Sequence, residues 1–539
     1  MQENSQSLLD KIKQLNAIGI ALSAERDTSK LLEQILHGAK SITNSDGGTV
    51  YLVTEDRGLR FEIISTDSLK LAMGGSTGIA IPFEPIPLYD VQGKPNDHMV
   101  APSAVIHNRT INIPDAYNTD EYDFSGTHAF DRKTSYHSQS FLTIPMKNHR
   151  EEIIGVLQLL NKVDEHTGEV IAFSGEDEQL VSSLASQAAV ALSNKELIDD
   201  LKALFESFIQ LIASAIDEKS PYTGGHCRRV PELTMMLARA VAATDSGPLR
   251  EFQLSDSDSY ELEIAAWLHD CGKIITPEYV VDKATKLETI FDRIHLIETR
   301  SEIVRRDLEL AVLRQLVRQH SPQQWQQAQD QVVELQQSLD EDLDFLRQSN
   351  TGSEFMSPEL QDRVHSIADS RQVSINGKLQ NFLTDNEVQN LTISRGTLTD
   401  AERSVINHHI TATIQMLEEL PFPRHLRRVP EFAGGHHERM DGKGYPRGLT
   451  GEQMSVQARI MAIADIFEAL TACDRPYKKA KTLSESLSIL GHMKRDRHID
   501  PDLLQIFLQK KVYLEYAKKF LEESQIDIIN PEDIPGYPF

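Results

Sequence analysis

The spacing of apolar residues changes along the first 200 positions of the chain. Residues 6–36 carry apolar side chains at helical spacing, with a break near Asp27 that is typical of a helix cap. From Gly48 onward the period becomes two, with Gly, Asp and Asn between the segments. This pattern predicts an N-terminal helix over residues 1–26 and an α+β domain with an antiparallel sheet over residues 27–195. The segments expected to be strands are 49–53, 59–64, 140–146 and 153–160.

A second helical pattern runs over residues 176–218 without proline or glycine. It predicts one long helix that continues from the α+β domain, with residues 196–217 as a connecting helix. Such a helix cannot bury its apolar stripe alone, so we favour a homodimer in which it packs against its copy; packing back onto its own domains is the alternative. The stripe consists of Leu180, Leu184, Ala188, Ala191, Leu197, Leu201, Leu204, Phe208, Leu211 and Ile212.

A stretch at about 296–396 differs in composition from its flanks. Ser321-Pro322 and Ser357-Pro358 have the form of helix starts, and glutamines surround a thin apolar stripe. We predict inserted helices, a long hairpin followed by a shorter helix. The composition favours a lid or a surface that docks a signalling partner.

The formal net charge of −26 over 539 residues limits the partners of the chain. DNA and anionic membrane surfaces would be repelled, so we expect no nucleic-acid partner. No apolar run approaches the roughly 20 residues that span a bilayer. The first residues are polar and lack a signal-peptide core, and three cysteines are too few for a disulfide framework, so we expect a cytoplasmic protein. A thiolate ligand from Cys227 or Cys271 is conceivable, but small buried cysteine is the commoner interpretation.

Two adjacent histidines, His436 and His437, begin the stretch around which the chemistry is organised. Each imidazole can offer a nitrogen to a metal, and the glycines and Pro446 that follow force a tight loop. Paired histidines also occur on solvated loops. The pair alone is therefore weak evidence for a metal site, and the prediction depends on the other segments.

Four more segments supply ligands of the same kinds. His269-Asp270 ends an apolar helix, where the carboxylate could bridge two cations and Lys273 could meet a phosphate oxygen; a structural His–Asp hydrogen bond is the alternative. Asp465, within another apolar helix, requires a cation or a hydrogen-bond network. Nitrogen and carboxylate ligands without a thiolate cluster favour a hydrolytic or redox-capable two-metal site over structural zinc. The other candidates are His226 and one of His408 and His409, of which the spacing from a capping box favours His409.

A further motif consists of Asn161, Lys162, Phe173, Asp177 and Glu178. With this signature, residues 27–195 resemble a GAF domain, a small-molecule sensor fold. The resemblance is closest to GAF domains that bind cyclic nucleotides, which implies cAMP or cGMP as a ligand. The same residues could instead lock the fold, which leaves another small ligand or a dimerisation module with an empty pocket.

Residues from about 205 to 515, without the insertion, resemble the HD-GYP domain of bacterial cyclic di-GMP phosphodiesterases. The resemblance implies an all-α domain over residues 218–515, a C-terminal tail over 516–539, and two divalent metal ions, with iron or manganese favoured. The motifs are His269-Asp270 with Gly272-Lys273, His436-His437-Glu438 with Asp441-Gly442 and Gly444-Tyr445-Pro446, and Arg475-Pro476-Tyr477.

The family pattern also implies a role for each ligand. His226, His269, Asp270 and Asp465 would hold one metal, and Asp270, His409, His436 and His437 would hold the second. Two departures are Tyr222, where some members have a glutamate that adds a third metal, and Glu468, where aspartate is frequent. The insertion is a third departure.

We therefore expect two-metal hydrolysis of cyclic di-GMP under GAF control. Asp270 and Lys273 would act at the reacting phosphate, Arg475 and Lys478 would hold the second phosphate, and Tyr445 would contribute to substrate choice or partner contact. Another HD-superfamily nucleotide phosphohydrolase would not need the glycine-tyrosine-proline loop. A non-catalytic protein that binds cyclic dinucleotides is the other alternative, but all candidate ligands are present, which favours an enzyme.

Overall fold

The structure, a computed structural model, describes residues 2–219, 225–318, 322–352, 355–473 and 480–537. It consists of two compact units, residues 1–205 and 206–539. In the described part of the chain, no helix combines the length and the apolar character needed to cross a membrane. The two units are considered separately below.

An antiparallel sheet is the centre of the first unit. Its strand order is β3-β2-β1-β7-β6-β5, with β4 paired to β2 and β8 paired to β7. The predicted strands correspond to β1, β2, β6 and β7, whereas sequence periodicity missed the four short strands. The bounds are β1 Ser45–Val53, β2 Gly58–Thr66, β3 Leu71–Gly74, β4 Ile86–Pro87, β5 Ile111–Ile113, β6 Phe141–Lys147, β7 Ile153–Val163 and β8 Val170–Ile171.

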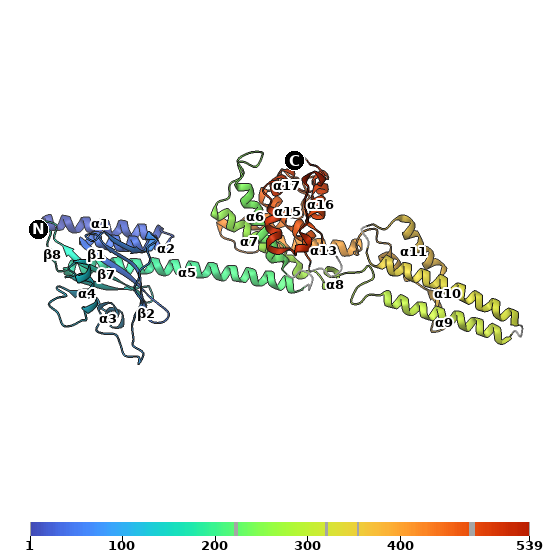
Figure 1. The fold of residues 1–539 in the computed structure, drawn as a ribbon, viewed down its shortest axis with the longest axis horizontal. Helices are drawn as coiled ribbons and strands as arrows, with labels where there is room; N and C mark the ends of the chain where they lie inside the picture. The colour runs from blue at the N-terminus through green and yellow to red at the C-terminus, as the bar shows by residue number, and fades with distance from the viewer. Residues whose placement is uncertain (1, 220–224, 319–321, 353–354, 474–479, 538–539) are drawn as a thin grey trace. The chain divides into compact units, whose positions relative to one another are not determined.

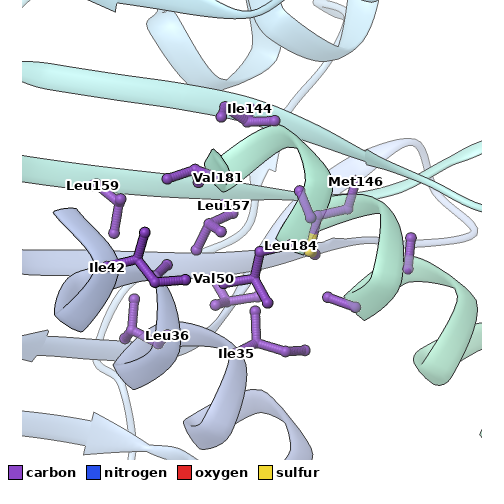
Figure 2. Close-up of a cluster of buried hydrophobic side chains, with 14 of the residues drawn as sticks. Ile35, Leu36, Ile42, Val50, Ile144, Met146, Leu157, Leu159, Val181 and Leu184 are labelled. Atoms are coloured by element: carbon purple, nitrogen blue, oxygen red, sulfur yellow. The ribbon is translucent and has the colours of Figure 1, made fainter. Parts of the chain in front are cut away.

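Helices cover both faces of this sheet. On one face, Ile35 and Leu36 of α2 and Leu184 of α5 meet the apolar side chains of β1, β6 and β7 (Figure 2). Neighbouring residues of a strand point to opposite faces, so Val50 of β1 joins this core while Tyr51 packs on the face that also contacts α3. The expected cap is present, because the Asp27 side chain accepts a hydrogen bond from Lys30 N. The helices are α1 Gln2–Ala24, α2 Thr28–Thr43, α3 Val100–Ile106, α4 Ser125–Thr134 and α5 Gly175–Lys219.

The predicted long helix is α5, which contains 45 residues. Its first turns belong to the core of the α+β domain, where Leu180, Leu184 and Ala188 are buried. Farther along, Leu201 is 65% exposed and Leu211 is 64% exposed. The apolar stripe is thus buried at its start and exposed from Leu197 onward.

The second unit is mostly helical, as predicted. Helices α9 and α10 form the expected hairpin, and α11 is the shorter helix after it (Figure 1). A small strand pair, β9 with β10, follows and was not predicted. The elements up to this point are α6 His226–Ala242, α7 Asp256–Leu268, α8 Glu278–Val281, α9 Ile294–Arg318, α10 Pro322–Asn350, α11 Pro358–Ser370, β9 Gln372–Ile375 and β10 Lys378–Asn381.

The inserted elements have an apolar core of their own, which includes Leu346, Ile367 and Phe382 and extends back to Leu287. The expected boundary at residue 515 falls inside α18, where Tyr516 is buried. The remaining helices are α12 Asp385–Leu391, α13 Asp400–Glu418, α14 Val429–Gly434, α15 Val456–Thr471, α16 Leu483–Arg495, α17 Pro501–Gln509 and α18 Val512–Phe520.

Candidate metal centre

Five segments of the second unit bring histidines and aspartates to one buried place. His226 is the first residue of α6, and His269-Asp270 follows α7 directly. His409 lies in the middle of α13, His436-His437 follows α14, and Asp465 lies on α15. All seven candidate ligands are therefore supplied by helices or by helix ends, which hold their side chains in place. They form two groups.

The first group contains His226, His269 and Asp270, whose ligand atoms lie within 4.8 Å of one another. Oδ2 of Asp270 is 3.2 Å from Nε2 of His226 and 3.3 Å from Nε2 of His269. Asp465 adds a second carboxylate, with Oδ1 3.4 Å from His226 Nε2. These four residues are those expected to hold one metal.

The second group contains His409, His436 and His437, again with ligand atoms within 4.8 Å. The other oxygen of Asp270, Oδ1, is 3.2 Å from Nε2 of His409. One carboxylate therefore faces both groups, one oxygen to each. His408, the neighbour of His409, is exposed and lies outside the group.

Main-chain carbonyls orient three of the imidazoles. Nδ1 of His269 donates to Ala266 O at 2.7 Å, and Nδ1 of His436 donates to Ala433 O at 2.6 Å. His409 donates in the same way to Ile406 O. A carbonyl can only accept, so Nδ1 carries the proton in each ring and Nε2 presents its lone pair to the centre.

Three atoms at the centre are buried without a hydrogen-bond partner among the described residues. They are Oδ1 of Asp270 and Nε2 of His409 and His436. Each is a lone-pair atom, and such atoms are costly to bury unless something pairs with them. Divalent cations bound by nitrogen and oxygen ligands fit this arrangement. Neither Cys227 nor Cys271 belongs to either described group.

Glu468 contacts a candidate ligand, a contact that the sequence analysis did not predict. It is 1% exposed and contacts Nδ1 of His226 at 2.5 Å and Nε of Arg229 at 2.7 Å. Burial opposes a charge on His226, but Glu468 and Asp270 outweigh it and raise the pKa of His226 to about 10. Burial also favours a neutral Glu468, yet His226 and Arg229 lower its pKa to about 2. The helical i, i+3 spacing of Asp465 with Glu468 could have revealed this contact.

The two adjacent histidines have the opposite electrostatics. Burial and the neighbouring imidazoles bring the pKa of His436 well below its ordinary value. Burial likewise lowers the pKa of His437 to about 4. Both rings are therefore neutral at pH 7, which is the form that binds metals.

The segment after Asp270 passes very close to α13. A Cβ at Gly272 would lie 2.0 Å from the carbonyl oxygen of His409, so a side chain cannot be accommodated. The Gly272 amide also donates to Oγ1 of Thr413 at 2.9 Å. Lys273 follows and pairs with Asp270. Burial disfavours its ammonium, but Asp270 and Asp465 raise the pKa of Lys273.

The glycine-tyrosine-proline loop is attached to the centre through two residues. Glu438 accepts hydrogen bonds from the amides of Arg447 and Leu449 at 2.7 and 2.9 Å, and so ties down the end of the loop. The ring of Tyr445 stacks on His437, with centroids 4.9 Å apart. Arg475, Lys478 and Tyr222 lie outside the described residues.

The signature residues of the first unit have structural partners. The side chain of Asn161 accepts from Gln139 N at 2.7 Å and donates to His137 O at 2.7 Å. Lys162 pairs with Asp177. Phe173 is buried in the core, and Glu178 accepts from Asn112 at 2.7 Å. These contacts join the last long strand, β5 and the start of α5.

Comparison with known proteins agrees with this division of the chain. A GAF domain model matches residues 27–192, and two HD domain models match residues 223–370 and 384–503. The chain therefore carries a GAF domain followed by an HD domain. Its HD region is related to phosphodiesterases of cyclic dinucleotides.

Two of these relatives show how far the similarity extends. A 3'3'-cGAMP-specific phosphodiesterase 3 of Vibrio cholerae is 24% identical over 65% of this chain and 53% of its own length. A cyclic di-GMP phosphodiesterase response regulator of Xanthomonas campestris is 38% identical over 22% of this chain and 31% of its own. The chain thus spans about half of the first relative and a third of the second.

A solved structure with a similar fold is the GAF domain from an Acinetobacter phosphoenolpyruvate-protein phosphotransferase. It is 14% identical, and the match covers 35% of this chain and 97% of that one with a TM-score of 0.26. Similarity at this level carries no functional information.

Proposed function

We propose that this protein is a metal-dependent phosphodiesterase that hydrolyses cyclic di-GMP. The observation that carries the proposal is Asp270, whose two oxygens face two separate groups of histidines. A carboxylate between two cations is the usual core of a two-metal hydrolase. The relatives named above, which act on cyclic dinucleotides, support the substrate class.

His226, His269, Asp270 and Asp465 would hold one cation, and Asp270, His409, His436 and His437 the other. When bound, such a pair supplies Lewis acidity for phosphodiester hydrolysis. The ligands are nitrogen and oxygen atoms only. We therefore favour iron or manganese over a structural zinc.

The protein is strongly acidic overall, so basic residues near the centre are needed to bind an anionic substrate. Lys273 pairs with the carboxylate of Asp270 and can neutralise a phosphoryl oxygen. A pocket of about 390 Å³ contains His436, His437 and Asp465, and Arg439 and Lys443 also line it. Both of these basic side chains contact Asp441, which partly neutralises their charge. Arg475 and Lys478 remain our candidates for the second phosphate.

A second candidate substrate is 3'3'-cGAMP. It is favoured by the relative that aligns over most of this chain, whose name specifies that substrate. The two dinucleotides differ in one base, whereas the metal centre contacts phosphates. The centre alone therefore does not discriminate between them.

Regulation is proposed to come from the GAF domain and from dimerisation. The exposed part of the α5 stripe, including Leu201, Leu204 and Leu211, is the surface that a second copy would cover. A cyclic nucleotide, cAMP or cGMP, is the proposed GAF ligand. Because the signature residues have structural partners, that ligand would have to be held by other side chains.

The proposal is tested with the purified full chain, loaded anaerobically with iron or manganese. Hydrolysis of cyclic di-GMP and of 3'3'-cGAMP is followed by chromatography of the products, and metal content is measured on the same samples. Turnover of either substrate that depends on metal supports the phosphodiesterase proposal, and the faster of the two identifies the substrate. Tight binding without any product would instead support a cyclic-dinucleotide-binding signalling protein. Asp369→Asn, an exposed substitution on α11, is the matched control for aspartate changes at the centre.

A further inference from the structure

A second pocket lies beside the metal centre and has no part in holding metals. Its volume is about 460 Å³, within the range of roughly 300–1,000 Å³ that is usual for small-molecule sites. Tyr445 lines both this pocket and the one that contains His436 and His437. The two pockets are therefore neighbours that share one aromatic side chain.

One wall of the second pocket is the outer face of α13. Ser404, His408 and Thr411 are spaced i, i+4 and i+7, so they lie on one side of the helix, and Asn407 adjoins them. The side chains of these four residues make no hydrogen bond to any described residue. Their donors and acceptors remain available to a ligand. His409, next to His408, points instead into the metal centre.

The other walls are mostly apolar but include Thr276, whose Oγ1 is buried without a hydrogen-bond partner among the described residues. Ile275, which is 54% exposed, ends the short helical segment that begins at Cys271, and Val405 is 43% exposed on α13. Tyr445 and Pro446 complete the lining. A site with apolar and aromatic walls and a few unpaired polar groups suits a flat heteroaromatic ring with a polar edge.

We propose that this pocket, the base subsite, binds one purine base of a cyclic dinucleotide whose phosphate lies at the metal centre. The inference rests on the proposed function. The geometry that supports it is the contact of Tyr445 with both sites, since its ring stacks on His437 at 4.9 Å and also lines the base subsite. In a cyclic dinucleotide each base is one ribose away from a phosphate, so a base site must adjoin the phosphate site.

Asn407 is the residue assigned to the edge of the base. Its amide offers one acceptor and two donors. Guanine and adenine both present a donor next to an acceptor on the Watson–Crick edge, and an amide can match either order by turning over. Asn407 therefore binds the polar edge of the base, and the apolar walls hold its faces.

The test uses two tryptophan substitutions on one face of α13. Ser404→Trp fills the base subsite, whereas Gln415→Trp, a matched control three turns farther along, lies roughly 16 Å away and outside its lining. For each metal-loaded protein, kcat/KM is measured for cyclic di-GMP, for 3'3'-cGAMP and for ethyl 4-nitrophenyl phosphate, a diester without a purine. We expect Ser404→Trp to lower the ratio of dinucleotide to simple-diester kcat/KM at least tenfold, and Gln415→Trp to retain the wild-type ratio.

A second substitution removes only the polar edge. Asn407→Leu keeps a similar volume, and we expect it to raise KM for the dinucleotide about tenfold with a smaller change in kcat, since one lost hydrogen bond weakens binding by about that factor. Asn407→Gln should recover part of the loss.

Failure of the base subsite and failure of the proposed function have different signatures. If cyclic dinucleotides are hydrolysed and Ser404→Trp leaves the ratio unchanged, or if both tryptophan variants change it equally, the base subsite is wrong and the phosphodiesterase stands. If the wild-type protein hydrolyses the simple diester but neither dinucleotide, the proposed function is wrong and the base subsite is wrong with it.

Discussion

The GAF signature and the metal centre are both buried clusters of polar side chains, but their polar atoms are satisfied in different ways. Asn161 has partners for both ends of its amide within the domain, and Lys162 supplies the positive charge that Asp177 needs. At the metal centre, lone-pair atoms of Asp270 and two histidines converge without a hydrogen-bond partner among the described residues. Oδ1 of Asp177 and Oδ1 of Asn112, whose amide contacts Glu178, also lack a partner, so the GAF network is not fully closed.

This difference separates structural residues from ligand-binding ones. A buried network that closes on itself stabilises a fold, because every desolvated group recovers a bond. A set of lone pairs from several elements that point to one place is stabilised by a bound cation. Signature residues alone do not show this distinction, since both clusters match a family pattern.

The largest expected effect is that of Asp270→Asn. The substitution removes the charge that faces both histidine groups, so we expect loss of both metals and at least a thousandfold loss of turnover. Metal analysis and product chromatography measure the two effects. Asp369→Asn should change neither, and metal-free protein that retained wild-type activity would contradict the two-metal scheme.

Breaking the ion pair between Lys162 and Asp177 should change the stability of the GAF domain and leave the metal centre unchanged. Asp177→Asn leaves Lys162 without its buried counter-charge, which costs about 3–5 kcal/mol when such a pair is broken. Thermal unfolding of the first unit should shift accordingly, while metal content at the HD domain stays at the wild-type value. An unchanged melting temperature would show that the pair does not lock the fold.

Glu468→Gln should weaken metal binding without abolishing it. Glu468 orients His226 through Nδ1, and loss of such a partner typically costs 10–100-fold in metal affinity. Competition with a chelator measures the affinity, and Glu468→Asp, which keeps the charge, should lie between wild type and Glu468→Gln. Equal affinities for all three proteins would remove Glu468 from the centre.

The smallest expected effect is the pH dependence due to Lys286, a buried residue whose partners are internal. Its Nζ donates to the carbonyls of Leu391 and Ile393, and burial lowers its pKa to about 8. The unfolded chain therefore binds more protons between pH 8 and about 10.4, so this residue's contribution to stability rises with pH in that window.

The measurement compares urea unfolding of wild type and Lys286→Met from pH 7 to 10. The free energy of unfolding of the wild-type protein, relative to that of the variant, should rise with pH. The slope should be less than about 1.4 kcal/mol per pH unit, the limit set by one proton. A constant difference across this range would contradict the lowered pKa.

Much of the architecture was predictable from local patterns. Period-two segments identified β1, β2, β6 and β7, and the absence of proline and glycine identified α5. The short strands β3, β4, β5 and β8 have two to four residues each, which is too few for a period to emerge. The strand pair β9 and β10 was missed for the same reason.

The candidate site was predictable in its members but not in its geometry. The sequence by itself determined the chemistry, because histidine and aspartate at helix ends and in apolar helices need a partner when buried. The sequence analysis also assigned Asp270 to both metals. Only the tertiary structure decided which oxygen of Asp270 faces which histidine group, that Glu468 contacts His226, and that Tyr445 lines both pockets. Those relations connect residues as much as 242 positions apart. They depend on how the helices pack, which local periodicity does not encode.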